Sequence, residues 1–179
     1  MFVDTATLYP VSLADLVLRL AELGMFELLW SDHLLEEVER VLVEYKGLAI
    51  ERAAYFCKCI REAFPKGRIS PETYLPLVAS RKGPDPDDHV HSAAVVAGGA
   101  TVVLSADKTG YPPIDIAPAR RRNPDTFVLE LLRRYPRDLI GVVDAMGASM
   151  REPLTHGQVL DRLATAGVPR FAARARETG

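Results

Sequence analysis

Apolar runs of strand length alternate with longer helical stretches along the first two thirds of the chain. Phe2-Val3 begins the first run, and residues 101–105 form a second one, Thr-Val-Val-Leu-Ser. Between such runs, apolar side chains recur every three or four residues, as they do from Leu13 to Leu20. This alternation is typical of βαβ units, which place parallel strands in one sheet beneath flanking helices. The sequence therefore predicts an α/β fold with a central parallel sheet.

Turn and cap residues give the expected bounds of the elements. Gly24, Gly47 and Pro65 end helical patterns, Ser31 is a plausible N-cap, and Asn123-Pro124 opens a helix. We expect helices over 11–23, 32–46, 49–64 and 88–97, with strands at 1–4, 101–105 and 114–116. Residues 68–70 fit a short strand, 74–78 fit either a strand or a helix, and 82–86 form a loop.

The pattern changes after Pro136. Three helical pieces follow without a strand, at about 137–151, 156–166 and 168–176. We therefore expect two parts, an α/β domain over residues 1–135 and a C-terminal helical extension over residues 136–179.

The composition is that of a globular protein. Of 179 residues, 48% are apolar and 26% are charged, which supports one buried core with a short appendage. The sequence shows no secretory signal and no apolar run near 18 residues, so we expect a cytoplasmic protein without a membrane span. Two cysteines, Cys57 and Cys59, are too few for a disulfide framework.

The net charge of −2 hides an asymmetry between the two ends of the chain. Residues 1–117 carry 11 Lys/Arg against 17 Asp/Glu, whereas residues 118–179 carry 11 against 7. An acidic part beside a basic part fits a metal site that adjoins a surface for a polyanion, although surface charge also serves solubility.

Single carboxylates follow the predicted strands. Asp4 ends the first strand, and Asp107 lies two residues beyond the strand that ends at Ser105. Because ligands of open parallel sheets bind at the carboxyl ends of the strands, both residues are candidates for a site, with a turn cap as the alternative role of Asp4. Glu37 lies beside Val38 at the margin of a helical apolar stripe, where its side chain can reach a cleft or remain on the surface.

Three carboxylates, Asp85, Asp87 and Asp88, cluster before the helix expected at 88–97. One of them can cap that helix, and three exceed this need, so some of them either repel one another in solution or share a cation. His89 and His91 follow, and we interpret them as structural residues rather than metal ligands.

Together these acids predict a site for Mg²⁺ or Mn²⁺, which prefer hard oxygen ligands. Thr5 and Ser105 could orient a carboxylate or a metal-bound water through their hydroxyls. Arg120, Arg121 and Arg122 suit bidentate contact with phosphate groups, with a solvated loop as the alternative reading.

Four segments together resemble the PIN-domain family. They are Phe-Val-Asp-Thr-Ala-Thr-Leu-Tyr-Pro at 2–10, Leu-Leu-Glu-Glu-Val-Glu-Arg-Val-Leu at 34–42, Asp-Pro-Asp-Asp-His-Val-His-Ser-Ala-Ala at 85–94, and Val-Val-Leu-Ser-Ala-Asp at 102–107. Asn-Pro-Asp-Thr-Phe at 123–127 is similar to the run before the family's last helix. The helical tail resembles an extension found on a subset of VapC-type toxins, including Val-Leu-Asp-Arg-Leu at 159–163 and Gly-Val-Pro-Arg at 167–170.

The resemblance implies a three-layer α/β/α fold and a Mg²⁺- or Mn²⁺-dependent endoribonuclease that acts as the toxin of a toxin–antitoxin system. By position, Asp4, Glu37, Asp87 and Asp107 match the four acids of the family as catalytic and metal-binding residues, and Asp88 is the rival of Asp87. The expected partners are a structured RNA, such as a tRNA or rRNA loop, and a cognate antitoxin protein. A homodimer stays open.

Two positions depart from the family pattern. Ala6 stands where an Asn usually follows the first Asp-Thr, and Gly110-Tyr111 stands where Asp-Phe is usual. These departures keep an alternative open, a non-catalytic PIN-like module that binds protein or RNA. A phosphoaspartyl phosphatase with Asp4 as nucleophile is disfavoured, because such sites carry a second Asp at the position of Ala6.

Overall fold

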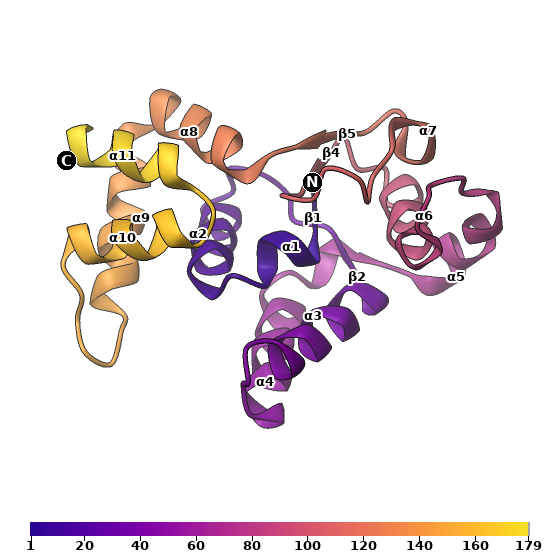
Figure 1. Ribbon diagram of the computed structural model, residues 1–179, viewed down its shortest axis with the longest axis horizontal. Coiled ribbons are helices and arrows are strands. Elements are labelled where there is room, and N and C mark those ends of the chain that lie inside the picture. Colours follow the sequence, from indigo (N-terminus) through magenta and orange to yellow (C-terminus); the bar gives the residue numbers. More distant parts are fainter. Residues whose placement is uncertain (179) are drawn as a thin grey trace. The chain divides into compact units, whose positions relative to one another are not determined.

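Five short parallel strands form the centre of the fold (Figure 1). The computed structural model describes residues 1–178. In one sheet β4 (Val102–Leu104) lies between β1 (Phe2–Val3) and β5 (Arg120–Arg122), and in the other β2 (Trp30–Ser31) pairs with β3 (Arg68–Ile69). A parallel bridge between Phe2 and Leu29, the residue before β2, joins the two sheets. The strands then follow the order β3, β2, β1, β4, β5.

The inner strands are buried because both faces of the sheet are covered. Phe2, Val3, Val103 and Leu104 are at most 1% exposed. Phe2 pairs with Val103 and Val3 with Leu104 in parallel register. A buried parallel strand needs apolar side chains on both faces, which is why these runs show no alternation with polar residues.

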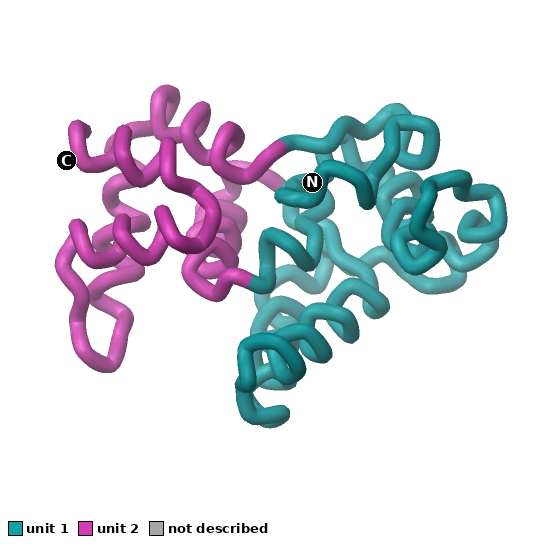
Figure 2. Tube along the Cα trace, in the orientation of Figure 1, with its two compact units in different colours: residues 1–9, 27–122 teal, residues 10–26, 123–179 magenta. Residues whose placement is uncertain are grey.

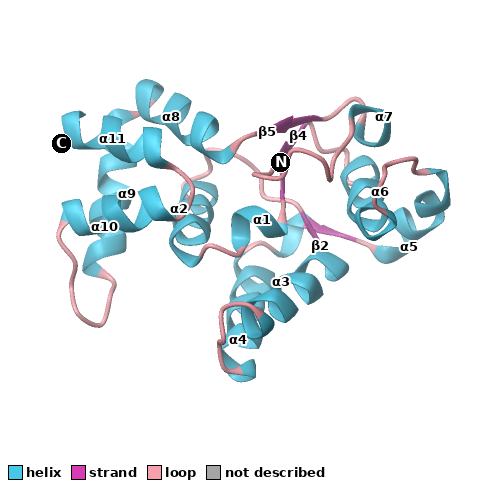
Figure 3. Ribbon diagram, viewed as in Figure 1, coloured by secondary structure: helices cyan, strands magenta, loops and turns pink. Residues whose placement is uncertain are grey.

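Helices alternate with the strands along the chain (Figure 3), and the predicted α/β/α fold with a central parallel sheet is confirmed. The Ser31 hydroxyl accepts the N–H of Leu34, as expected of an N-cap, and α3 buries Leu34, Leu35, Val38 and Leu42. The helices that belong with the sheet are α1 (Thr5–Leu8), α3 (Asp32–Glu44), α4 (Ile50–Ala63), η1 (Pro65–Gly67), α5 (Pro71–Tyr74), η2 (Leu75–Ser80), η3 (Pro86–Asp88), α6 (His89–Ala97) and α7 (Pro113–Ile116).

The described chain forms two compact units, which Figure 2 shows in different colours. One unit comprises residues 1–9 and 27–122, and the other comprises 10–26 and 123–179. The second unit is helical, as expected of the extension, and consists of α2 (Val11–Glu22), α8 (Pro124–Arg134), α9 (Pro136–Ala148), α10 (His156–Thr165) and α11 (Pro169–Thr178). In it α2 packs on α9 and α8 packs on α11. The domain boundary after residue 135 stays a prediction, since the compact units divide the chain elsewhere.

Two short segments differ from the sequence prediction. Residues 114–116, expected as a strand, lie in helix α7, which begins at Pro113 where a proline fits the first helical turn. Arg120–Arg122, for which a solvated loop was the alternative reading, form strand β5, in register with Val102–Leu104. An edge strand pairs on one side only, so its polar side chains do not reveal it as a strand.

Two of the open segments are now assigned. Arg68–Ile69 is a strand, and residues 74–78 are helical within α5 and η2. Cys57 is buried and Cys59 is partly exposed, and both are free thiols. Over residues 1–178, no helix combines the length and the apolar character that crossing a bilayer requires.

A buried carboxylate connects two helices of the second unit. Asp125, in the first turn of α8, is 6% exposed. It accepts the backbone N–H groups of Phe171 at 2.8 Å and of Arg170 at 3.3 Å, both in the first turn of α11. Asp125 therefore satisfies amides that α11 itself leaves without an intrahelical partner.

We expect Asp125→Ala to destabilise this unit. The substitution leaves two amides of α11 without their acceptor, which costs roughly 1–3 kcal/mol in the free energy of unfolding. Urea denaturation followed by circular dichroism measures the effect. Asp138→Ala is the matched control, because Asp138 is an exposed acid in the first turn of α9. Equal stability of the two variants would contradict the role of Asp125.

Candidate active site

The carboxyl ends of the two central strands β1 and β4 carry the first part of the site. Asp4 follows β1 directly, and its backbone N–H donates to the Leu104 carbonyl of β4 at 3.1 Å. Ser105 follows β4. The strand order reverses between β1 and β4, because the chain first proceeds outward to β2 and β3 and then returns to β4 and β5. Ligands of open α/β sheets bind at such a reversal.

Asp4 is buried, 6% exposed, and both of its carboxylate oxygens accept hydrogen bonds. The Ser105 hydroxyl donates to Oδ2 and the Tyr111 hydroxyl donates to Oδ1, each at 2.6 Å. The Ala6 N–H also reaches Oδ2, at 3.4 Å, as in a helix N-cap. Burial raises the pKa of Asp4, and the two hydroxyl bonds oppose this shift without cancelling it.

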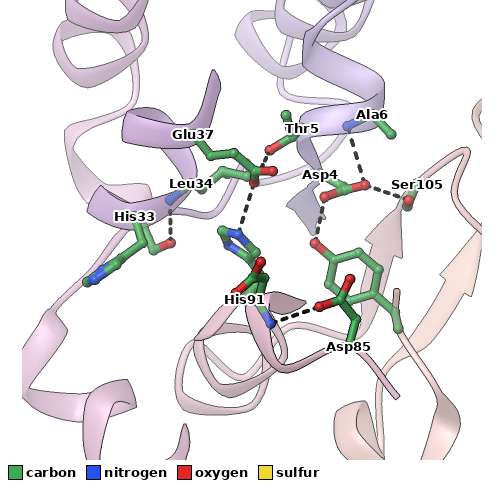
Figure 4. Close-up of polar contacts among 12 residues, drawn as sticks. Asp4, Thr5, Ala6, His33, Leu34, Glu37, Asp85, His91 and Ser105 are labelled. Atoms are coloured by element: carbon green, nitrogen blue, oxygen red, sulfur yellow. Dashed lines mark hydrogen bonds and ion pairs between the residues drawn. The ribbon is translucent and has the colours of Figure 1, made fainter. Parts of the chain in front are cut away.

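Glu37 comes from helix α3 and faces the same region (Figure 4). Its Oε2 accepts the Thr5 hydroxyl at 2.7 Å and lies 3.0 Å from Nε2 of His91. Burial acts to raise the pKa of Glu37, but the hydrogen bonds from His91 and Thr5 outweigh it and hold the pKa below its ordinary value. Glu37 is thus a carboxylate rather than a carboxylic acid at neutral pH.

The two candidates for the third acid lie in different surroundings. Asp87 is exposed, and its backbone N–H donates a hydrogen bond to Asp85 Oδ1 at 3.0 Å. Asp88 is half-buried, and burial, followed by the charge of Asp85 and then those of Asp107 and Asp4, raises its pKa to about 6. Mutual repulsion of this kind requires proximity, so Asp88 belongs with Asp4 and Asp107.

Hydrogen bonds hold the pKa of Asp107 below its ordinary value. Its Oδ1 accepts the Thr109 backbone N–H at 2.8 Å and the Thr109 hydroxyl at 2.9 Å. The bond from the Thr109 N–H is the largest influence that lowers the pKa of Asp107, and the positive charge of Arg121 adds to it. The Ser105 hydroxyl accepts the Asp107 N–H at 3.0 Å, which ties Asp107 to the oxygen that also contacts Asp4.

Gly110 leaves a gap between Asp88 and Asp107. A Cβ atom at this position would lie 2.9 Å from Asp107 Oδ2 and 3.0 Å from Asp88 Oδ2. Two carboxylate oxygens from different elements therefore border one small space, which exists only because residue 110 has no side chain. Gly110 stands where the family usually has Asp. Its lack of a side chain removes a charge and also leaves the space between the two carboxylates open.

Three residues have contacts in this region that the sequence did not predict. Tyr111 contacts Asp4, and His91, which the sequence analysis interprets as structural, contacts Glu37. Asp115, which is 2% exposed, accepts the backbone N–H groups of Lys82 at 2.7 Å and Gly83 at 2.5 Å. It thereby holds the loop that leads to Asp88. A Tyr where the family usually has Phe was the one signal in the sequence, because a buried phenol needs a hydrogen-bond partner.

The arginines of β5 do not act as one group. Arg120 is exposed, whereas Arg121 is partly buried and its Nη1 donates to the Ser105 carbonyl at 3.1 Å. Successive side chains of a strand point to opposite faces, so Arg121 lies on a different face from Arg120 and Arg122.

The same three arginines account for most of the net positive charge of residues 118–179. They belong to the first unit, and the helical unit carries nine Lys/Arg and nine Asp/Glu. The expected basic part is therefore not the helical unit.

The donor set suits an oxygen-preferring divalent cation, although residues 1–178 contain no ready cluster of three or more His, Cys, Asp or Glu side chains around one point. Asp4, Glu37, Asp88 and Asp107 offer hard carboxylate oxygens, and two of these oxygens border the gap at Gly110. A carboxylate oxygen that accepts one hydrogen bond keeps a lone pair for a metal. These four acids are therefore the residues that could hold an ion.

Comparison with models of protein families agrees with this geometry. Residues 1–109 match the model of the PIN domain. The chain belongs to the PIN-domain family. Residues 124–177 match the model described as the VapC50 C-terminal domain, so this is a VapC-type PIN protein with a C-terminal extension. Membership supports nuclease activity in general. Searches of curated proteins and of solved structures gave no match.

The raised pKa of Asp88 predicts a pH dependence of stability in the absence of metal. In the unfolded chain Asp88 titrates near 3.8, and in the folded chain near 6. Between these values the folded state binds more protons, so the contribution of Asp88 to the free energy of unfolding falls as the pH rises from about 4 to about 6. Asp88→Asn lacks this contribution.

Urea denaturation in EDTA across this pH range measures the difference. The stability of the wild type relative to Asp88→Asn should decline as the pH rises through the window. Asp87→Asn is the control, because it removes an exposed neighbouring charge. A constant difference between wild type and Asp88→Asn would show that Asp88 is not in the crowded environment described above.

Proposed function

We propose that this protein is a divalent-metal-dependent endoribonuclease and the toxin of a type II toxin–antitoxin module. The observation that supports it best is the grouping of Asp4, Glu37, Asp88 and Asp107 in a PIN-family chain, at or facing the carboxyl ends of its two central strands. Of the two candidates for the third acid, we propose Asp88 instead of Asp87, because Asp88 interacts electrostatically with Asp4 and Asp107.

In this proposal the four acids hold Mg²⁺ or Mn²⁺. Such an ion lowers the pKa of a bound water and offsets the charge that develops on the scissile phosphate. Ser105 orients the carboxylate of Asp4 and positions the backbone of Asp107, and Thr5 orients the carboxylate of Glu37. A bound ion would supply an activated water as the attacking group, so the proposal needs no covalent nucleophile.

The arginines of β5 are proposed to contact the RNA backbone. Arg121 is bonded to the Ser105 carbonyl and interacts with Asp107, so its guanidinium lies beside the acids. A guanidinium forms paired hydrogen bonds with phosphate oxygens. The substrate class is structured RNA with single-stranded loops, such as those of tRNA or rRNA, because loops expose bases and backbone to a protein cleft. Such a substrate would be met in the cytoplasm.

The match of residues 124–177 to the VapC50 C-terminal domain supports the assignment as a toxin. It implies a cognate antitoxin protein that would cover the acidic site. A homodimer is compatible with the proposal and is not needed for it, since the four acids come from a single chain.

Asp4→Asn is expected to lower Mn²⁺-dependent cleavage of total RNA by about a thousandfold, because a bound metal supplies several kcal/mol of charge stabilisation. Asp88→Asn should have a comparable effect, whereas Asp87→Asn should retain most of the activity. EDTA is the control for metal dependence, and circular dichroism checks the fold. Equal loss from Asp87→Asn and Asp88→Asn would contradict the choice of Asp88. A folded wild type that cleaves no RNA with Mn²⁺ would favour the non-catalytic module.

Gly110→Ala tests the gap between Asp88 and Asp107. The backbone at Gly110 is one that other residues adopt, so the added methyl group acts through space alone. It must displace at least one carboxylate, and we expect about tenfold weaker Mn²⁺ binding by calorimetry. Gly141→Ala is the matched control, because a Cβ atom at Gly141 of α9 meets nothing within 4 Å. Unchanged Mn²⁺ affinity in Gly110→Ala would show that this gap does not take part in metal binding.

A further inference from the structure

Each of the two innermost acids is held by two side-chain donors that come from separate parts of the chain. Asp4 accepts from Ser105 and Tyr111, and Glu37 accepts from Thr5 and His91. Thr5, His91 and Ser105 lie in the segments that resemble the family, whereas Tyr111 stands where the family usually has Phe.

The side chain of Tyr111 has one polar group, its hydroxyl, which donates a hydrogen bond to Asp4. The side chain is 4% exposed, and its hydroxyl lies 2.6 Å from Asp4 Oδ1. A phenylalanine would fill the same space without this bond. The bond fixes the oxygen of Asp4 that Ser105 does not contact, so the carboxylate is held from two sides and cannot rotate without losing a buried hydrogen bond.

His91 is 6% exposed, and its two ring nitrogens have different surroundings. Nε2 lies 3.0 Å from Glu37 Oε2, while Nδ1 is buried and has no hydrogen-bond partner among residues 1–178. A carboxylate accepts hydrogen bonds, so Nε2 carries the proton and Nδ1 is left as a bare lone pair. This tautomer buries no unpaired N–H group.

The contacts of His91 favour a role toward Glu37 over a role as a metal ligand. A histidine that binds metal through Nε2 usually donates its Nδ1 proton to a second group. Here Nδ1 has no acceptor within the described chain, and Nε2 faces Glu37 Oε2. We therefore assign His91 to Glu37.

We propose that Tyr111 and His91 are positioning residues that hold Asp4 and Glu37 in the orientation in which they bind the metal ion. This inference rests on the proposed function. Both bonds to Glu37 reach Oε2, and Oε1 takes part in neither. On Asp4, the bond from Tyr111 uses one of the two lone pairs of Oδ1. Both acids thus keep oxygen lone pairs for a cation while their side chains are held in place. Hydrogen bonds to metal-binding carboxylates typically change affinity or activity by about 10- to 100-fold.

The test compares buried hydroxyls at two places in the same unit. Tyr111→Phe removes the bond to Asp4, and Tyr74→Phe removes a matched bond, since Tyr74 is fully buried with its hydroxyl 2.7 Å from His33 Nδ1. We expect both variants of the full chain to lose a similar amount of thermal stability in EDTA. Only Tyr111→Phe should bind Mn²⁺ about tenfold more weakly by calorimetry, and its cleavage rate should recover largely at saturating Mn²⁺.

His91 supplies a second, independent comparison. Gln places an amide N–H near the position of Nε2, so His91→Gln should bind Mn²⁺ within about twofold of the wild type. His91→Leu has no donor and should bind about tenfold more weakly. This pair decides the question even if Tyr111→Phe does not fold, because the rescue by Gln measures the donor and not the packing.

The outcomes separate the two hypotheses. Wild-type affinity for Mn²⁺ in Tyr111→Phe and in His91→Leu would overturn the positioning role and leave the proposed function standing. A wild type that binds Mn²⁺ and cleaves no RNA would overturn the nuclease and leave the positioning role to be decided by the same affinities. A wild type that binds no Mn²⁺ would overturn both. If Tyr74→Phe weakened Mn²⁺ binding as much as Tyr111→Phe, the effect of Tyr111→Phe would be one of stability alone, and the positioning role of Tyr111 would be overturned.

Discussion

The burial of the Asp4 carboxylate between β1 and β4 is the constraint on which the site depends. A charged carboxylate can stay in such a place only if donors surround it. The donors are the Ser105 hydroxyl from the end of β4, the Tyr111 hydroxyl and, more distantly, the Ala6 amide. Their positions follow from the parallel pairing of Val3 with Leu104, which brings residues 4 and 105 together. The sheet register and the polar site are therefore parts of one arrangement.

Separate sets of hydrogen bonds hold the other acids around Asp4. Glu37 is held by Thr5 and His91, Asp107 by Thr109, and the loop before Asp88 by the buried Asp115. Asp4, Glu37 and Asp107 thus each accept hydrogen bonds from their own donors. Burial, together with the charges of Asp85, Asp107 and Asp4, raises the pKa of Asp88 to about 6. Burial raises the pKa of Asp4 as well. A cation beside these acids would offset such shifts.

The sequence predicted the architecture and most of the residues that the structure brings together, and its errors have physical reasons. The expected strand at 114–116 is a helix because Pro113 begins a helical turn and Asp115 points its carboxylate to Lys82 and Gly83. Arg120–Arg122 form a strand because an edge strand needs only backbone pairing with β4. Sequence spacing could not decide whether Asp87 or Asp88 is the third acid, since adjacent residues differ mainly in the direction of their side chains.

The sequence by itself determined the parallel sheet, the helical extension and the identity of the four regions that supply acids. These features follow from local periodicity and from the rule that parallel strands end at one edge of a sheet. The tertiary structure decided the surroundings of each acid. It places Tyr111 against Asp4, His91 against Glu37, and Asp115 against the backbone of the loop that leads to Asp88. Residues 4 and 111, or 37 and 91, are far apart in the chain, and no local pattern records their contact. Burial then makes such contacts obligatory, because a buried phenol or carboxylate must find its partner wherever the fold has placed it.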